Sequence, residues 1–377
     1  MVKSLKNSSP ELLKRVMFIV PRYHTNLVGS VKALKESGHE VLILAAYQDM
    51  IEDHSQIKPI ILPQSIISRF MVHLFGSGGG DNAYYFPSFL ATLNVLIKFR
   101  PDLVIVRNPR RIAALYGFAA AKLLGCRVLF YTLSRFDLWS NRSKLLVSWF
   151  MSIFSTAWYS PLMVDLDKQF EEEGFFFLPF AVEGRPNGLG MGMPARVLMV
   201  GKYRLTRKNH DVFIESIVKV RKKIPVKALI VGEVVDKLGE LNFIRLRQKI
   251  EKLGASEYIN LQRNVDHSLM VNIYADSDLF VLPSSREPAG VSVLEAISNG
   301  VPAICSSTCG IRTYIQSGKC GSVFDDGCVD GLTRSILEVI SDEDTYIRYS
   351  QAAAILSTRF SYQAYINALR HLIKNRW

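Results

Sequence analysis

The sequence predicts an α/β protein made of two Rossmann-like, doubly wound domains that face a central cleft. Three observations predict this fold class. The chain has 377 residues, whereas a single domain ordinarily has about 100–200. Short apolar runs alternate with helix-length amphipathic segments along the whole chain. A stretch rich in glycine and proline at 183–195 interrupts this alternation, which then restarts.

The first half contains the elements of one such domain. The segment 27–38 has apolar residues at helical spacing and ends at Gly38, and the alanine-rich segment 111–125 is also predicted as a helix. The glycine-rich stretch 75–87 is predicted as a loop. Apolar runs predict strands at 15–21, 39–46, 101–108, 126–133 and 156–160.

The second half repeats the pattern after the break. A helix is predicted at 291–299, because Gly300 suits its C-terminal cap and Pro302 cannot continue it. We therefore expect one domain over 1–187 and a second over 188–359. Apolar runs in the second half predict strands at 195–201, 226–233, 258–263, 277–284 and 301–307.

The composition limits the cellular setting. A hydrophobic fraction of 49% and a charged fraction of 21% are typical of a globular protein rather than a disordered one. The five cysteines form no C-x-x-C pair and no ligand-spaced set with histidine, so we expect free thiols in a reducing compartment and no metal site. No signal peptide or membrane-spanning segment is predicted. We expect a cytoplasmic protein that is soluble or peripheral to a membrane.

The net charge of +12 is unevenly distributed. Residues 1–150 contain 19 Lys and Arg against 9 Asp and Glu, so the first half carries nearly all of the excess. A basic surface favours phosphates, whether in nucleic acid, anionic lipid or a phosphorylated substrate. A solvated basic face is the plainer alternative, and charge alone does not choose among these.

Two glutamates, Glu287 and Glu295, lie beside a predicted strand and at the start of a predicted helix. In doubly wound sheets, ligands bind beyond the carboxyl ends of strands and at helix N-termini. The amides of Ala289, Gly290 and Val291 should face that crevice and favour an anion. Carboxylates accept hydrogen bonds from sugar hydroxyls, so the combination predicts a sugar nucleotide. The alternative is a glutamate that complements the helix dipole and a solvated loop acid.

A basic loop follows the first strand of the second half. Lys202 and Lys208 bracket it, and Arg204 and Arg207 lie between them. Such a cationic loop suits a leaving diphosphate, whose negative charge grows as its bond to the sugar breaks. For Arg204 and Arg207 the favoured interpretation is a solvated basic loop.

Three stretches of the second half resemble a known family. "VGKYRLTRKNHD", "ADSDLFVLPSSREPAGVSVLEAISNGVPAICSS" and "CGSVF" are similar to retaining glycosyltransferases of the GT-B fold, family 4. The resemblance is strong over about 195–330 and weaker over 15–190. The resemblance implies that Glu287 lies near the donor sugar hydroxyls and that Glu295 binds the ribose diol. Lys202 stands where the family usually has arginine, and Lys208 where it has lysine.

The resemblance implies a complete activity. The chain is expected to be a retaining, metal-independent glycosyltransferase that moves a sugar from a nucleotide-diphosphate sugar to a glycan or lipid-linked acceptor, in cell-surface polysaccharide or glycolipid synthesis. Lys202, Lys208 and Glu287 would be catalytic, and no cofactor is implied. The backbone at Asn264 and Val265 would bind the nucleobase edge. The C-terminal helix, at about 360–377, would pack back onto the first, acceptor domain.

The acceptor side departs from the family pattern. Family members often carry a Gly-Gly pair after the first strand, where this chain has Asn26 and a single Gly29. They often carry a histidine near the end of a later strand, where this chain has none. The nearest polar candidates are Tyr131, Thr132, Ser134 and Arg135.

The basic first half suggests a further hypothesis, a peripheral face for anionic membrane at the inner side of the plasma membrane. Apolar residues at 66–75 are interleaved with the basic ones. A solvated face with a buried apolar helix is the alternative. The basic residues of this proposed face are Arg69, Lys98, Arg100, Arg107, Arg110, Arg111, Arg135, Arg142 and Lys144.

Two rival functions remain. One is a nucleotide-sugar epimerase of similar fold, and the other is a basic nucleic-acid-binding protein, although no nucleic acid is expected.

Overall fold

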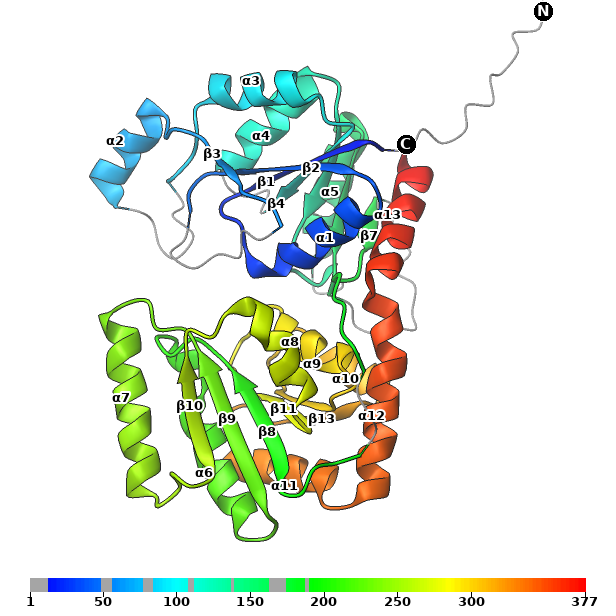
Figure 1. Cartoon of the computed structure of the whole chain (residues 1–377). Coiled ribbons are helices and arrows are strands. Elements are labelled where there is room, and N and C mark those ends of the chain that lie inside the picture. Colours follow the sequence, from blue (N-terminus) through cyan, green and yellow to red (C-terminus); the bar gives the residue numbers. More distant parts are fainter. Residues whose placement is uncertain are drawn as a thin grey trace, which may run out of the picture.

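The computed structural model describes residues 13–48, 56–76, 84–107, 112–136, 139–162, 174–186 and 190–377. Within these ranges the chain forms two units stacked one above the other, each built on a parallel sheet with helices on both faces (Figure 1). The predicted fold class, two Rossmann-like doubly wound domains, is confirmed. The predicted boundary between residues 187 and 188 falls outside the described residues, and so does most of the predicted loop at 75–87.

The first sheet has the strand order β3-β2-β1-β4-β5-β6-β7, and every described pairing in it is parallel. Its central strands are almost continuous apolar runs because helices cover both faces of the sheet. The predicted strands of this half are confirmed to within two residues at each end, whereas the short strands β3 and β7 escaped prediction. The strands are β1 Arg15–Val20, β2 Glu40–Ala45, β3 Ile60–Ile61, β4 Leu103–Arg107, β5 Arg127–Tyr131, β6 Thr156–Ser160 and β7 Phe175–Phe177.

Helices pack on both faces of the first sheet. Residues of α1 and α13 form the core on one face, and residues of α3, α4 and α5 form it on the other. The helices of this half are α1 Val28–Glu36, α2 Ile66–Phe75, α3 Phe89–Phe99, α4 Ile112–Leu123 and α5 Asn141–Phe154.

The second sheet has the order β10-β9-β8-β11-β12-β13, again with parallel pairings only. Counted within its own unit, this order is 3-2-1-4-5-6, the arrangement of dinucleotide-binding folds. All five predicted strands of this half are confirmed, whereas the sixth strand, β13, escaped prediction. The strands are β8 Ala195–Val200, β9 Val226–Gly232, β10 Ile259–Arg263, β11 Leu279–Leu282, β12 Ala303–Ser306 and β13 Gly321–Phe324.

Two helical layers cover the second sheet. One core contains residues of α8, α9, α10 and α12, and the other contains residues of α6, α7 and α11. The helices are α6 His210–Arg221, α7 Lys237–Lys252, α8 His267–Ala275, α9 Val291–Ser298, α10 Arg312–Gly318, α11 Val329–Ile340, α12 Glu343–Ser357 and α13 Tyr362–Arg376.

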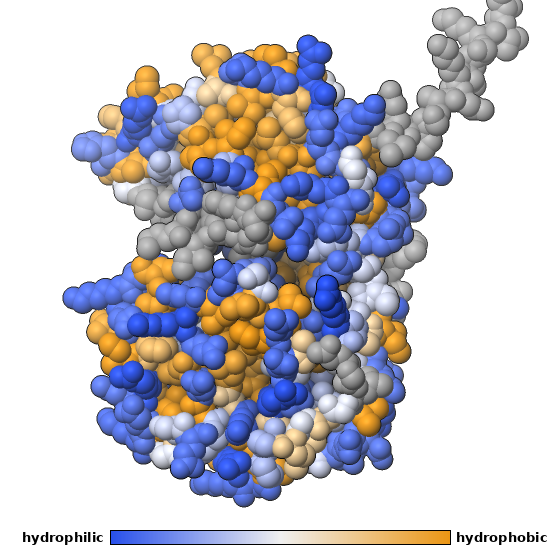
Figure 2. Space-filling model, in the orientation of Figure 1, coloured by the Kyte–Doolittle hydropathy of each residue, from blue (hydrophilic) through white to orange (hydrophobic). Residues whose placement is uncertain are grey.

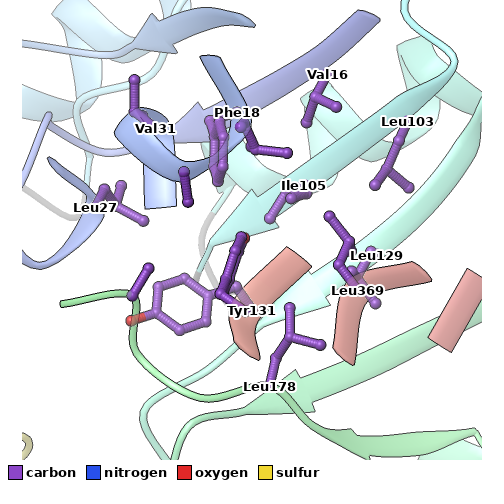
Figure 3. Packing of buried hydrophobic residues seen from close by; sticks show 14 of the residues in the cluster. Val16, Phe18, Leu27, Val31, Leu103, Ile105, Leu129, Tyr131, Leu178 and Leu369 are labelled. Carbon is purple, nitrogen blue, oxygen red and sulfur yellow. The ribbon is translucent and has the colours of Figure 1, made fainter. Parts of the chain in front are cut away.

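The C-terminal helix α13 returns to the first unit. Leu369 of α13 packs beside Leu129 of β5 (Figure 3). The Arg376 guanidinium donates to the carbonyl oxygens of Thr156, at 2.8 Å, and Met151, at 3.0 Å. Met151 is in the last turn of α5, so this cation complements the negative end of that helix.

The chain joins the two units through a close approach at Gly29 of α1. A Cβ at this position would overlap the carbonyl oxygen of Ala181, so the glycine allows the linking segment to pass directly over the start of α1. The backbone N–H of Val182 then donates to the carbonyl oxygen of Phe360 at 2.9 Å. The segment that contains Val182 and the segment that contains Phe360 thus run side by side between the two units.

The five cysteines are free, as the sequence predicts, and four of them are buried. Among the described residues, no helix is both long and apolar enough to cross a bilayer.

Candidate active site

The strand order locates the candidate site in the second unit. The strands β8 and β11 are neighbours, and the chain leaves them toward opposite sides of the sheet. Ligands of doubly wound sheets bind at such a switch point, beyond the carboxyl ends of the two strands. The loops that begin there are 201–209 and 283–290, and they carry most of the predicted site residues.

A cluster of three charges joins these two loops. One carboxylate oxygen of Glu287 accepts hydrogen bonds from Lys208 Nζ at 2.7 Å and from a guanidinium nitrogen of Arg207 at 2.6 Å. The side chains of Glu287 and Lys208 are only 11% and 13% exposed, whereas that of Arg207 is 39% exposed. Burial alone would raise the pKa of Glu287, but Lys208 and Arg207 together hold it below its usual value.

Arg207 corrects the sequence interpretation. We expected it to be part of a solvated basic loop, but it binds Glu287 directly because the loop carries it across to the segment after β11. Its position next to Lys208 in the sequence was the available signal. Arg204 is different, since it is 47% exposed and pairs with Asp236 at 3.1 Å.

Uncharged contacts fix the two loops against each other. The Ser285 backbone N–H donates to the Arg207 carbonyl oxygen at 2.8 Å. The Asn209 side-chain amide donates to the carbonyl oxygen of Pro283 and to the hydroxyl of Ser285, each at 2.8 Å. Ser285 in turn donates to Asp326 at 2.7 Å. The charged cluster therefore rests on a hydrogen-bonded support, which favours preorganised side chains.

Lys202 takes a different position from Lys208. It forms an ion pair with Glu233, at 2.6 Å, at the end of β9. Lys202 also lies close enough to the first unit to act on His24, in the loop after β1. Burial, with Arg107, Arg22 and Lys202, lowers the pKa of His24 to about 3. The loops after the first strands of both units therefore approach each other across the cleft.

Glu295 lies in the second turn of α9. Its carboxylate accepts a hydrogen bond from the Tyr274 hydroxyl at 2.6 Å. Burial, together with the nearby Glu295, raises the pKa of Tyr274 well above its usual value. Tyr274 therefore stays a neutral donor at any working pH and fixes the orientation of the carboxylate, a role that sequence reasoning missed.

Glu295 borders an open pocket between the two units. Two of the predicted site residues, Val291 and Glu295, line the pocket, whereas Lys202, Lys208 and Glu287 do not. The polar lining also comes from both units and consists of Asn26, Lys32, Glu183, His267, Tyr274, Asn299 and Tyr362.

The other predicted residues have structural contacts. The Asn264 side chain accepts from the Val234 N–H at 2.8 Å and donates to its carbonyl oxygen at 3.1 Å, so it fixes the loop after β9. Val265 packs against the core of the second unit. Ala289 is buried, and Gly290 precedes α9 with a φ of 83°, where a Cβ would contact Leu282 and Cys309 too closely.

On the acceptor side, the candidate Tyr131 is buried in the core. Its ring stacks on Tyr159 with centroids 4.9 Å apart, and burial raises its pKa to about 12. Arg107 connects Tyr131 to the cleft, because it lies over the tyrosine ring and donates to Asn26 at 3.2 Å. Asn26 borders the pocket, so it is better placed than Tyr131 to contact a ligand.

The second unit matches a model of a known family. Residues 188–355 match the family model described as glycosyl transferases group 1. This region contains the charged cluster, the loops after β8 and β11, and Glu295. No group of three or more His, Cys, Asp or Glu side chains arranged for a metal occurs among the described residues.

Relatives agree with this assignment. The chain is 25% identical over 186 residues to a D-inositol 3-phosphate glycosyltransferase of Corynebacterium jeikeium, an alignment that covers 48% of this chain and 44% of the relative. The chain thus spans less than half the length of the curated relatives it matches.

Solved structures are similar over the whole fold. A glycosyltransferase of Rickettsia africae has a TM-score of 0.69 at 15% identity, and the match covers 97% of this chain and 99% of that one. HepE of Anabaena in complex with UDP also has a TM-score of 0.69, at 13% identity, with 96% and 100% coverage. At this identity the likeness shows the shared two-unit fold.

Proposed function

We propose that this chain is a retaining glycosyltransferase, of the family 4 type, that uses a nucleotide-diphosphate sugar as donor. The observation that carries the proposal is the charged cluster of Arg207, Lys208 and Glu287 at the switch point of a unit that matches group 1 glycosyl transferases. A cation pair beside a carboxylate suits a diphosphate bound next to sugar hydroxyls.

Each site residue has a proposed role in donor binding or in charge stabilisation. Lys208, with support from Arg207 and Lys202, stabilises the charge that develops on the leaving diphosphate. Glu287 orients the donor sugar, and Glu295, held by Tyr274, binds the ribose diol. The backbone near Asn264 and Val265 contacts the base, and the amides of Ala289, Gly290 and Val291 contact the diphosphate. These roles combine what the sequence resemblance implies with the contacts of Arg207 and Tyr274.

The reaction is a displacement at the anomeric carbon with retention. The bond between this carbon and the diphosphate oxygen breaks while the bond to the acceptor oxygen forms on the same face. The acceptor proton passes to the departing phosphate, so no protein nucleophile is required. The chain's part is to hold donor and acceptor in attack geometry, which lowers the entropic cost of their encounter. We propose that no metal takes part, because Lys208 and Arg207 supply the positive charge.

The acceptor is proposed to be a glycan or a lipid-linked molecule that enters over the first unit, in cell-surface polysaccharide or glycolipid synthesis. The name of one relative supports this class, since it is a phosphatidylinositol monomannoside mannosyltransferase. The free thiols favour a cytoplasmic location. An epimerase or a nucleic-acid-binding protein is not favoured by any of these relatives.

The test is donor turnover. The protein is incubated with a panel of nucleotide sugars and glycan or glycolipid acceptors, with and without a chelator, and nucleoside diphosphate release is measured. The proposal predicts acceptor-dependent release for one donor, unaffected by the chelator, and a product of unchanged anomeric configuration by NMR. Conversion of the donor to an epimeric nucleotide sugar without an acceptor would indicate an epimerase, and an inverted product or loss of activity with chelator would refute the mechanism.

A further inference from the structure

The helix α2 exposes an apolar stripe to solvent. Ile66, Phe70 and Leu74 repeat every four residues, and they are 82%, 61% and 54% exposed. The single fully buried residue of α2 is Ser68, whose hydroxyl donates to the Tyr84 carbonyl oxygen and accepts from the Phe86 N–H at 3.0 Å. A surface helix normally buries its apolar side. This helix is instead held by a polar contact and exposes its apolar side.

The helix α5 has the same pattern. Leu145, Trp149 and Ile153 also repeat every four residues and are 73%, 65% and 54% exposed. The one fully buried residue of α5 is Met151. The chain thus exposes two separate stripes of large apolar side chains on the same unit.

The helices α3 and α4 lie between α2 and α5 in the packing of the first unit. The start of α3 is hydrogen-bonded to the segment before α2, α3 packs on α4, and Phe118 of α4 contacts two rings of α5. Leu90 of α3 and Leu123 of α4 are exposed as well, at 73% and 70%. Figure 2 shows hydrophobic side chains gathered over the part of the first unit that contains α2 and α3. We call the exposed side of α2, α3, α4 and α5 the apolar face.

The apolar face carries charge of one sign. None of the residues of α2, α3, α4 and α5 is acidic. On the second unit, α6, α7, α11 and α12 all contain acidic residues. The basic residues of these four helices are Arg69, Lys98, Lys122, Arg142 and Lys144, of which Arg69, Lys98 and Arg142 are exposed.

The apolar face contains fewer basic residues than the set that the sequence suggested. Arg107 points to Asn26 in the cleft rather than to the apolar face. Arg110 and Arg111 lie outside the described residues. The expected alternative, a buried apolar helix at 66–75, is wrong, because this helix is exposed.

We propose that the apolar face docks on an anionic phospholipid bilayer, with the stripes of α2 and α5 inserted among the acyl chains and the basic residues at the headgroups. Large apolar side chains, a tryptophan and basic residues without acidic ones match the chemistry of that surface. A protein partner would be expected to complement these cations with its own acids but would not need two separate apolar stripes. The inference goes beyond the proposed transfer and does not depend on it.

The test is co-sedimentation of the full chain with vesicles. Vesicles of phosphatidylcholine with about one third phosphatidylglycerol should bind the protein at low salt, and binding should weaken as salt rises. The double variant Ile66→Glu, Phe70→Glu should lower the partition coefficient at least about tenfold, because each removes a large apolar group and adds a negative charge. Trp149 emission should shift to the blue on binding.

Ile355→Glu is the control for the isoleucine change, because Ile355 is also a highly exposed isoleucine, at 72%, on α12 of the second unit. It should leave vesicle binding unchanged, and all variants should keep the wild-type melting temperature. Trp149→Leu identifies the source of the emission shift.

Equal binding by the Ile66→Glu, Phe70→Glu variant and the wild type would overturn the proposal, and so would an absence of binding. A wild-type dimer in analytical ultracentrifugation that this variant dissociates, without vesicle binding, would assign the face to self-association instead. Donor turnover with a soluble acceptor should be the same in every variant, so failure of this proposal leaves the proposed transfer standing.

Discussion

Replacing Glu287 by Gln should destabilise the second unit and alter donor turnover. In the structure both cationic nitrogens of Lys208 and Arg207 contact one oxygen of Glu287, at 2.7 and 2.6 Å. They are therefore no more than about 5 Å apart, and without the carboxylate they repel each other. The glutamine keeps the shape of the side chain but removes the charge that holds them together.

The size of the effect follows from burial. Removing one partner of a fully buried ion pair costs about 3–5 kcal/mol. Here Lys208 is 13% exposed, but Arg207 is 39% exposed and can turn into solvent. We therefore expect a loss of about 2 kcal/mol at pH 7, between the buried limit and the value for an exposed pair.

Glu240→Gln is the matched control. Glu240 accepts from Arg263 at 2.7 Å, but these side chains are 42% and 49% exposed. An exposed pair of this kind contributes less than about 1 kcal/mol. The assay is urea unfolding followed by circular dichroism, with equal slopes required for the comparison.

The pH dependence gives an independent check. The pKa of Glu287 is held below its usual value of 4.5, so its stabilisation is present above that value and is lost as the pH falls through the folded-state pKa. The difference between wild type and Glu287→Gln should therefore close in acid. Turnover should fall more than nucleoside diphosphate affinity. Equal losses for Glu287→Gln and Glu240→Gln, or a difference that persists in acid, would refute the reasoning.

Three further predictions follow from the site. Lys208→Ala should lower turnover about 100- to 1,000-fold, and Lys202→Ala should lower it less. Steady-state kinetics and a thermal melt measure this, and normal turnover of Lys208→Ala would mean that the diphosphate binds elsewhere. Tyr274→Phe should weaken nucleoside diphosphate binding about 3- to 10-fold in calorimetry, because Glu295 loses its orienting hydrogen bond; unchanged affinity would contradict this role. Burial lowers the pKa of His210 from 6.5 to about 4, so its neutral form should contribute full stability above pH 6.5 and the stability should decline toward pH 4. His210→Gln should reduce this decline, which the urea midpoint measured against pH would show.

The elements of both sheets could be predicted from the sequence because strands buried on both faces are continuous apolar runs. The strands β3, β7 and β13 could not be predicted, since each has only two to four residues and is too short to show a period. The helix α2 was identified as apolar, but its exposure was not, because the hydrogen bonds of Ser68 that hold this helix to the segment 84–86 leave no periodicity in the sequence.

The charged site was partly predictable. The strand–loop–helix pattern located Lys208, Glu287 and Glu295, because loops beyond parallel strands meet at one edge of a sheet. The pattern could not show that Arg207 rather than Lys202 reaches Glu287, since this depends on the path of the loop between them. Nor could it show Tyr274, which comes from a helix of the preceding βα unit and meets Glu295 only in the folded chain.

The measurement that tests the central claim most directly is the binding of nucleoside diphosphates to wild type and Glu295→Gln by isothermal titration calorimetry. The account predicts that the diphosphate released from the productive donor binds the wild type and that the variant binds it about tenfold or more weakly, with an unchanged melting temperature. If no nucleoside diphosphate binds the wild type, or if the variant binds it equally well, the donor site does not lie at the carboxyl ends of β8 and β11 beside Glu295.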